Sequence, residues 1–214
     1  MNHKAILGVI ISLAISVPLA AHAQDEPPSR LPLVPVDTDD PILRPMFQGM
    51  IDRGGKPANM HRTVGNAPAI FKEYVDLAYA IRRDAITPRL DREVMIMRAA
   101  QLANGEYEFL AHKAMALGCG LTEEQANAME NWQDSDLFDE RHRAILAYAD
   151  GLASPDSVDD DTFDALAKHY NPQEIVELTM TANFYTAAAR LTNALKVRPD
   201  ADIEKLSKLQ SCSG

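Results

Sequence analysis

The 214-residue chain contains only two cysteines, Cys119 and Cys212, which lie far apart in the sequence. No CxxC pair is therefore available for a redox dithiol, a zinc site or a c-type haem. In an oxidising compartment the two cysteines could form a disulfide. The alternative is two unpaired thiols, with Cys119 acting as a small buried apolar residue. The sequence leaves both readings open.

Positive charge is also scarce. The chain has 21 Lys and Arg against 31 Asp and Glu, which gives a formal net charge of −10 at pH 7. This balance disfavours nucleic acid and anionic membrane as partners, because both carry negative charge. It favours a small-molecule substrate that is uncharged or weakly polar.

The chain lacks an apolar run of the length that a membrane-spanning helix needs, about 20 residues. The run over 5–19 is shorter; Lys4 precedes it, and the small residues Ala21 and Ala23 follow it. This pattern predicts a secretory signal peptide over residues 1–23, cleaved near Ala23. The mature protein is then expected in the periplasm or the medium, without a membrane partner.

The sustained two-residue alternation of strands is missing, and apolar residues recur instead at spacings of three and four. The predicted fold class is all-α. About 190 residues remain after cleavage, which suits a single domain. Residues 24–58 are predicted as a Pro-rich extended N-terminal arm with a short helical candidate at 42–53, residues 59–197 as the helical domain, and 198–214 as a charged tail.

Cap signals predict where two helices begin. Thr87 and Pro88 are expected as the N-cap and first residue of one helix. Asn171, Pro172 and Glu174 combine a cap, a first-turn proline and a carboxylate three residues on. They predict a long helix that ends near residue 195.

Two helices joined by a short turn are predicted between Leu90 and Leu121. They carry Glu93 on the first helix and Glu108 and His112 on the second. Glu108 and His112 are four residues apart and share a helix face, and antiparallel packing would bring Glu93 opposite His112. A buried carboxylate beside an imidazole can pass a proton near neutral pH. Glu93 and His112 are therefore the candidate catalytic residues.

Each of these residues also has a structural explanation. Glu108 lies in a first helical turn, where the helix dipole favours any acid. His112 could be a satisfied core residue, and Glu93 could pair with Arg92 or Arg98. A metal site made of Glu93, Glu108 and His112 is conceivable with iron, manganese or zinc, but three ligands from one hairpin are few. No metal or cofactor is predicted.

The run REVMIMRAAQLANGEYEFLAHKAMALGCGLTEEQ resembles the core motif of the carboxymuconolactone decarboxylase and alkylhydroperoxidase D superfamily. The segments DERHRAILAYADGL and NFYTAAARLTNALKV are similar to its later helices. The motif's Glu and His fall on Glu93 and His112. Gly105 and Glu108 occupy the two positions where the peroxidase branch has cysteine, so the chain resembles the cysteine-free branch with an EYEWxxH-type hairpin.

The resemblance implies an alkylhydroperoxidase D-like helical bundle that forms homo-oligomers: dimers, trimers or hexamers. Members of the decarboxylase branch act on a small lactone acid by proton transfer and loss of carbon dioxide, without a cofactor. Glu93 and His112 would supply that acid/base chemistry. Four further residues are expected to bind or orient the substrate: Tyr107, Glu108, His61 and Tyr185. Asn193 could also line the site.

The leading hypothesis is an exported, lyase-like enzyme that carries out decarboxylation, lactone chemistry or isomerisation of a small organic molecule. A non-enzymatic oligomeric binding protein on the same scaffold is the alternative. Hydroperoxide reduction is a third reading. It would depend on Cys119, because the usual pair of thiols is absent from the hairpin.

Overall fold

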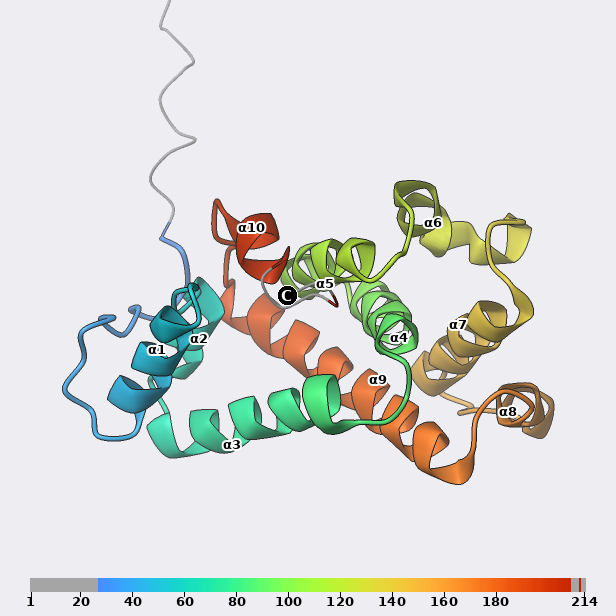
Figure 1. Ribbon diagram of the computed structural model, residues 1–214, viewed down its shortest axis with the longest axis horizontal. Coiled ribbons are helices and arrows are strands. Elements are labelled where there is room, and N and C mark those ends of the chain that lie inside the picture. The colour runs from blue at the N-terminus through green and yellow to red at the C-terminus, as the bar shows by residue number, and fades with distance from the viewer. Residues whose placement is uncertain (1–26, 209–211, 213–214) are drawn as a thin grey trace, which may run out of the picture.

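The computed structural model describes residues 27–208 and Cys212 (Figure 1). The signal peptide predicted at 1–23 lies outside the described residues. Within them every regular element is helical, which confirms the all-α class. The elements are α1 Leu43–Asp52, α2 Asn59–Val64, α3 Pro68–Tyr79, the π-helical turn η1 Ala80–Asp84, α4 Arg89–Leu102, α5 Glu106–Gly118, α6 Glu123–Ala128, the 3-10 turn η2 Met129–Asp134, α7 Glu140–Ala153, α8 Asp160–Ala167, α9 Pro172–Leu195 and α10 Ile203–Lys208.

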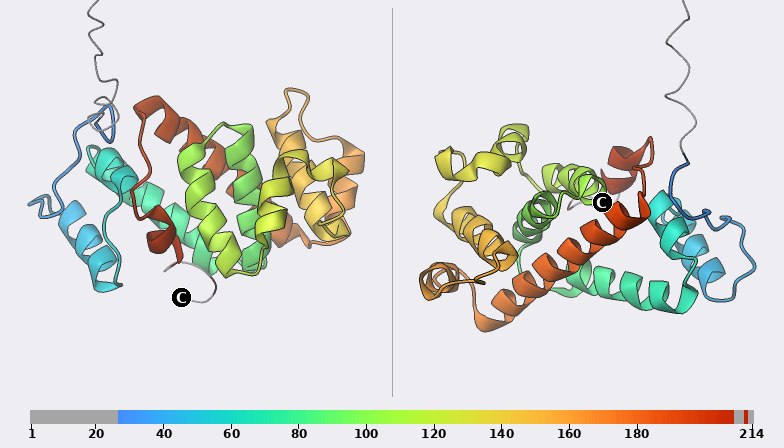
Figure 2. Two further views of the ribbon diagram at one scale, coloured as in Figure 1. Left: turned by 90° about the horizontal axis from the view of Figure 1, so that it is seen from above. Right: turned by 180° about the vertical axis from the view of Figure 1, so that it is seen from behind.

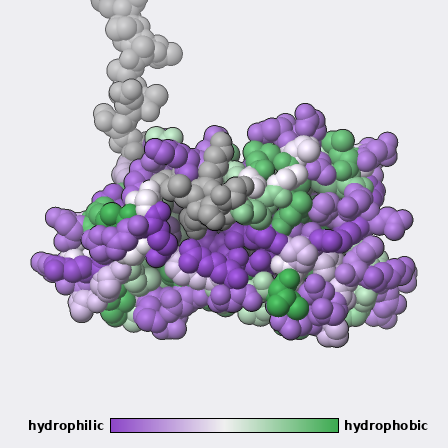
Figure 3. All heavy atoms as spheres, in the orientation of Figure 1, coloured by the Kyte–Doolittle hydropathy of each residue, from purple (hydrophilic) through white to green (hydrophobic). Residues whose placement is uncertain are grey.

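The α4–α5 hairpin occupies the middle of the molecule. Helices α1 to α3 lie at one end and α6 to α8 at the other, and the long helix α9 runs across both halves (Figures 1 and 2). On the face seen in Figure 1, hydrophobic residues form scattered patches among hydrophilic ones (Figure 3). The chain is a single helical assembly organised around α4.

Helix α4 is central and buried nearly all round, with its charged residues paired inside the fold. Residues 91–100 are all buried, which leaves this helix no solvent-facing side over almost three turns. The turn into α5 uses Asn104 at φ 53°. Gly105 follows, and a Cβ there would lie 2.4 Å from the Cβ of Ala189. Glycine at this position therefore lets the hairpin approach α9 closely.

The two predicted helix starts have different outcomes. The long helix is confirmed, because Asn171 caps α9 with a reciprocal contact to Glu174 and α9 ends at Leu195. The predicted Thr87 cap is wrong: α4 begins at Arg89, one residue after Pro88. The Thr87 hydroxyl donates instead to the Glu177 carboxylate over 2.6 Å. A tertiary acceptor thus competes successfully with the local cap.

The extended arm predicted over 24–58 is interrupted by α1. Leu43, Phe47 and Met50 are spaced by four and three residues and bury one helix face, and Phe47 meets Phe71 of α3 edge to face. The irregular segment before α1 contacts the end of α9, where the Arg30 N–H donates to the Leu195 carbonyl over 2.8 Å. The short helical candidate predicted at 42–53 is therefore confirmed as α1.

The C-terminal segment returns to the centre of the fold. Helix α10 packs on α5, and Cys212 forms a disulfide with Cys119, the residue that follows α5. Of the two readings that the sequence left open, the structure has the disulfide. Its loop spans 93 residues and joins the tail to the central hairpin.

Candidate functional site

The α4–α5 hairpin brings Glu93 and His112 into direct contact, as the helical spacing predicted. His112 Nδ1 lies 2.6 Å from Glu93 Oε2. Glu93 is fully buried and His112 is 2% exposed. The pair is therefore shielded from solvent, where an ionic hydrogen bond is strong.

Arg89 completes this pair on the other side of the carboxylate. Its Nε donates to Glu93 Oε1 over 2.6 Å, from one helical turn earlier in α4. Burial alone would raise the pKa of Glu93, but His112 and Arg89 outweigh it and hold the pKa below its ordinary value. Glu93 is thus an anion that accepts, so the proton of the shared hydrogen bond lies on His112 Nδ1.

The arginines that the sequence suggested as partners of Glu93 have other contacts. Arg92 donates to the carbonyl of Ile81, and Arg98 pairs with Asp150 over 2.6 Å. The pairing of Glu93 with Arg92 or Arg98 is therefore wrong. The spacing of four residues between Arg89 and Glu93 was the available signal, because such pairs lie on one helix face.

Glu108 shares the face of His112 but does not hydrogen-bond to it. Its Oε2 lies 3.9 Å from His112 Nε2, and its Oε1 is buried without a hydrogen-bond partner among the described residues. Burial raises the pKa of Glu108, and the charges of His112 and Arg82 only partly oppose it. The site therefore sets an anionic carboxylate, Glu93, beside a carboxyl group that tends to keep its proton.

A cavity of about 70 Å³ lies against Glu108 and His112. Three other residues that the sequence proposed, His61, Tyr107 and Tyr185, line it as well. The ring centroid of Tyr185 lies 4.5 Å from that of His112, in an edge-on arrangement. Most of the remaining lining is apolar or aromatic: Ala58, Met60, Tyr74, Val75, Ala78, Ala111, Met115, Phe184 and Ile203.

Asn193 does not line this cavity. Its side-chain amide donates to the carbonyls of Ala103 and Asn104 over 3.1 Å each, and so supports the hairpin turn. It also borders a separate cleft with Glu106 and Tyr107. Tyr107 is thus the residue common to the cavity and this outer cleft.

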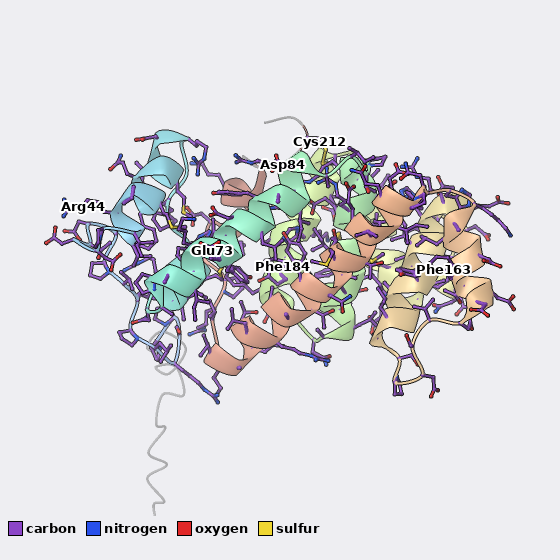
Figure 4. All side chains as sticks on the ribbon, turned by 90° about the horizontal axis from the view of Figure 1, so that it is seen from below. Arg44, Glu73, Asp84, Phe163, Phe184 and Cys212 are labelled. Carbon is purple, nitrogen blue, oxygen red and sulfur yellow. A yellow bond between two sulfur atoms is a disulfide. The ribbon has the colours of Figure 1, made fainter. Side chains whose placement is uncertain are left out.

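Several cavity residues escaped the sequence reasoning, among them Tyr74 of α3 and Arg82 of η1. Phe184 of α9 faces α3 (Figure 4), and its ring centroid lies 4.8 Å from that of Tyr74. Tyr74 belongs to the amphipathic pattern of its helix, but Arg82 carries no sequence signal. Both reach the cavity because η1 contacts α9 and Tyr74 of α3 meets Phe184 there.

His61 and the tyrosines of the cavity are held neutral. Burial, helped by the charge of Arg82, lowers the pKa of His61 to about 4. His61 Nδ1 accepts from the Ala58 N–H over 3.1 Å, so its other nitrogen carries the proton. Burial raises the pKa of Tyr107 and of Tyr185. These side chains can therefore offer hydrogen bonds without adding charge.

A second buried carboxylate on α4, Asp91, forms a separate polar cluster. Its Oδ2 accepts from the hydroxyl of Tyr170 over 2.8 Å and from the guanidinium of Arg141. His142 Nε2 lies 3.6 Å from Oδ1. Burial acts to raise the pKa of Asp91, but the hydrogen bonds from His142, Tyr170 and Arg141 outweigh it and the pKa is lowered.

Among the described residues, no group of three or more His, Cys, Asp or Glu is placed to hold a metal ion. Both oxygens of Glu93 are engaged, one by His112 and one by Arg89. No helix within 27–208 is long and apolar enough to cross a membrane. The geometry is that of a buried carboxylate–imidazole pair whose histidine lines a cavity.

Comparisons with known proteins give a family match over part of the chain and a shared fold. Residues 68–151 match the Carboxymuconolactone decarboxylase family. The uncharacterized protein YnjA of Escherichia coli (strain K12) is 32% identical over 71 residues, which are 33% of this chain and 39% of YnjA. The chain therefore matches well under half the length of that relative.

Two solved structures share the fold. An uncharacterized peroxidase-related protein with an alkylhydroperoxidase AhpD core, from Ralstonia eutropha JMP134, has a TM-score of 0.74 at 20% identity and covers 86% of this chain and 98% of its own. The debrominase Bmp8 has a TM-score of 0.65 at 24% identity, over 81% of this chain and 94% of its own. The chain thus carries a segment, residues 68–151, that matches the Carboxymuconolactone decarboxylase family, and over most of its length it shares the fold of an alkylhydroperoxidase AhpD core.

Proposed function

We propose that this protein is a cofactor-independent enzyme that transfers protons on a small organic molecule bound in the cavity beside His112. The reaction class is decarboxylation, lactone chemistry or isomerisation. The observation that carries the proposal is the hydrogen bond between His112 Nδ1 and the anionic Glu93. It leaves Nε2 as the nitrogen of His112 that can react.

His112 acts as the general base in this scheme. With its Nδ1 proton donated to Glu93, the lone pair of Nε2 can accept a proton from the substrate. The imidazolium that forms lies against the Glu93 carboxylate, which stabilises it, while Arg89 fixes the orientation of that carboxylate. Glu93 is thus a positioning residue, because His112 stands between it and the cavity.

Glu108 supplies the complementary acid. Its carboxyl group is buried, has a raised pKa and keeps one oxygen without a hydrogen-bond partner among the described residues. A protonated carboxyl can donate to an oxygen that gains negative charge when His112 removes a proton. Tyr107 and Tyr185 add neutral hydroxyl groups to the same cavity.

The cavity favours a compact, largely apolar ligand, because aliphatic and aromatic side chains supply most of its wall. The structural relative Bmp8 has been solved with 2,3,4-tribromopyrrole, a small ring. This supports a small ring compound as the kind of ligand to test first. The net charge of −10 argues further against a polyanionic ligand.

The disulfide supports the proposal that the protein is exported to the periplasm or the medium, because such bonds persist in oxidising compartments. It also takes up both cysteines of the chain. Hydroperoxide reduction by Cys119 would therefore require a prior reduction step. We propose in addition that the protein works as a homo-oligomer, as the family resemblance implies.

The alternative is a binding protein in which the same polar residues form a buried network. Deuterium exchange separates the two. The protein is incubated in D₂O with a panel of small lactones, β-keto acids and halogenated pyrroles, and NMR follows deuterium incorporation and carbon dioxide release. We expect turnover of at least one compound by the wild type and none by His112→Gln. Saturable binding of panel compounds without exchange or turnover would favour the binding protein.

A further inference from the structure

Helix α10 forms part of the wall of the cavity that holds the acid/base pair. Ile203 and Ser207 line that cavity, and both side chains are buried. The helix packs on α5, which carries Glu108 and His112. It lies outside the segment 68–151 that matches the family. The catalytic hairpin thus has a cover from a part of the chain that the family match does not include.

Polar contacts hold the beginning of this C-terminal segment. The Asp200 carboxylate accepts from the Asn59 N–H over 2.9 Å, and Asp202 pairs with Lys56 over 2.7 Å. The Lys56 and Asp202 side chains are 47% and 41% exposed, so this ion pair adds little. Ile203 adds apolar contacts, in a cluster with Tyr107, Ala111 and Val197. The non-covalent hold on this short helix is therefore one small apolar cluster and a few polar contacts.

The far end of the segment is held covalently. Cys212 is joined to Cys119 directly after α5 (Figure 4). The tether therefore ties α10 to the same helix that presents His112. Six residues form α10, a length that is marginal for a helix without such support.

We propose that α10 is a cover over the catalytic cavity, that the Cys119–Cys212 disulfide latches it, and that Ile203 limits the size of the ligand admitted. Reduction by a dithiol would break the S–S bond. Two electrons and two protons would pass to the protein as thiols at Cys119 and Cys212, and the reductant would leave as its own disulfide. Helix α10 would then move away from the cavity and expose His112.

Chemical labelling of His112 tests the latch without a known substrate. Diethyl pyrocarbonate modifies accessible imidazole nitrogens, and mass spectrometry of peptides reports each histidine separately. We expect His112 to react at least fivefold faster after treatment with dithiothreitol than before it. In the Cys212→Ser variant, which cannot form the disulfide, His112 should react without dithiothreitol as fast as in the reduced wild type. His169, an exposed residue beyond α8, serves as the internal control and should not change.

Equal labelling rates of His112 in the oxidised and reduced proteins would overturn the latch, provided circular dichroism shows the same helix content. If His169 and the amide exchange of α4 also accelerate, reduction unfolds the whole domain, and the proposal of a local cover is wrong. Because the readout is labelling and not turnover, the result is independent of the proposed chemistry.

The role of Ile203 is tested with the disulfide intact. Ile203→Ala should raise the labelling rate of His112 and bind the larger members of a series of mono-, di- and tribrominated pyrroles more tightly. Ile86→Ala is the matched control, because Ile86 is 55% exposed and does not line the cavity. Unchanged size preference in Ile203→Ala would contradict its role as the limiting side chain.

Discussion

Helix α4 buries two carboxylates two residues apart, Asp91 and Glu93, and we propose different roles for them. Each is at most 1% exposed, each meets an arginine and each has a histidine nearby. Burial acts to raise the pKa of both, and their partners outweigh it and lower the pKa of both. Burial and charge therefore do not distinguish a structural carboxylate from one in a reactive site.

The two clusters differ in the surroundings of their histidine side chains. His112 accompanies Glu93, its Nε2 lies 3.9 Å from Glu108 Oε2, and both His112 and Glu108 line a cavity. His142 accompanies Asp91, and its second nitrogen lies 3.3 Å from Asp139, the residue that caps α7. One imidazole is connected to a space that can hold a ligand, and the other is enclosed by partners within the protein.

The largest expected effect comes from exchanging each histidine for glutamine. His112→Gln should lower the rate of proton transfer by about 10²- to 10⁴-fold, the usual contribution of a general base. His142→Gln, the matched control, should stay within twofold of the wild type. Deuterium incorporation from D₂O measures both. An equal loss in the two variants would remove the distinction between the clusters.

Asp91→Asn should lower the stability of the protein and leave its activity nearly unchanged. The hydrogen bonds that Asp91 accepts from Tyr170 and Arg141 hold α4 to α7 and to the chain before α9, so their loss should cost about 2 kcal/mol of unfolding free energy. Activity should remain within twofold. Urea unfolding followed by circular dichroism gives the stability. A stable but inactive Asp91→Asn protein would show that the second cluster also serves the reaction.

Removal of a single hydroxyl group tests whether Asp91 is ionised. Tyr170→Phe deletes one hydrogen bond to the charged Asp91 and should cost about 1.5 kcal/mol. Thermal melting at constant pH measures the cost, with Tyr148→Phe as a control for loss of a neutral hydrogen bond to Thr179. A Tyr170→Phe protein no less stable than Tyr148→Phe would argue against an ionised Asp91.

The smallest effect concerns Glu108 and depends on pH. Its folded-state pKa is raised, so above about pH 4.3 the unfolded chain ionises first and the wild type loses stability as pH rises toward the folded pKa. Glu108→Gln does not titrate. The unfolding free energy of Glu108→Gln minus that of the wild type should therefore increase from pH 4 to pH 8. A constant difference over this range would mean that the pKa of Glu108 is not raised.

Local periodicity explains how much of this site could be predicted. Glu93, Glu108 and His112 belong to one helical hairpin, whose 3.6-residue repeat and short turn fix their relative positions. Arg89 follows the same rule, since it precedes Glu93 by four residues. The long helix with its Asn171 cap was likewise readable from local signals.

The rest depends on contacts between distant segments. Tyr74 and Arg82 reach the cavity because α3 packs near α9, and no spacing in the sequence encodes that approach. Thr87 was misread as a cap because Glu177, 90 residues away, takes its hydroxyl. Helix α10 joins the site only through its packing on α5 and the Cys119–Cys212 bond.

The tautomer of His112 tests the central claim most directly. Protein labelled with ¹⁵N-histidine, at pH 8, gives one set of ring signals for each imidazole. We expect His112 to carry its proton on Nδ1, with a strongly downfield proton that disappears in Glu93→Gln, and Nε2 to show the shift of an unprotonated nitrogen. A proton on Nε2 would contradict the claim, because the nitrogen that borders the cavity could then accept nothing from a substrate.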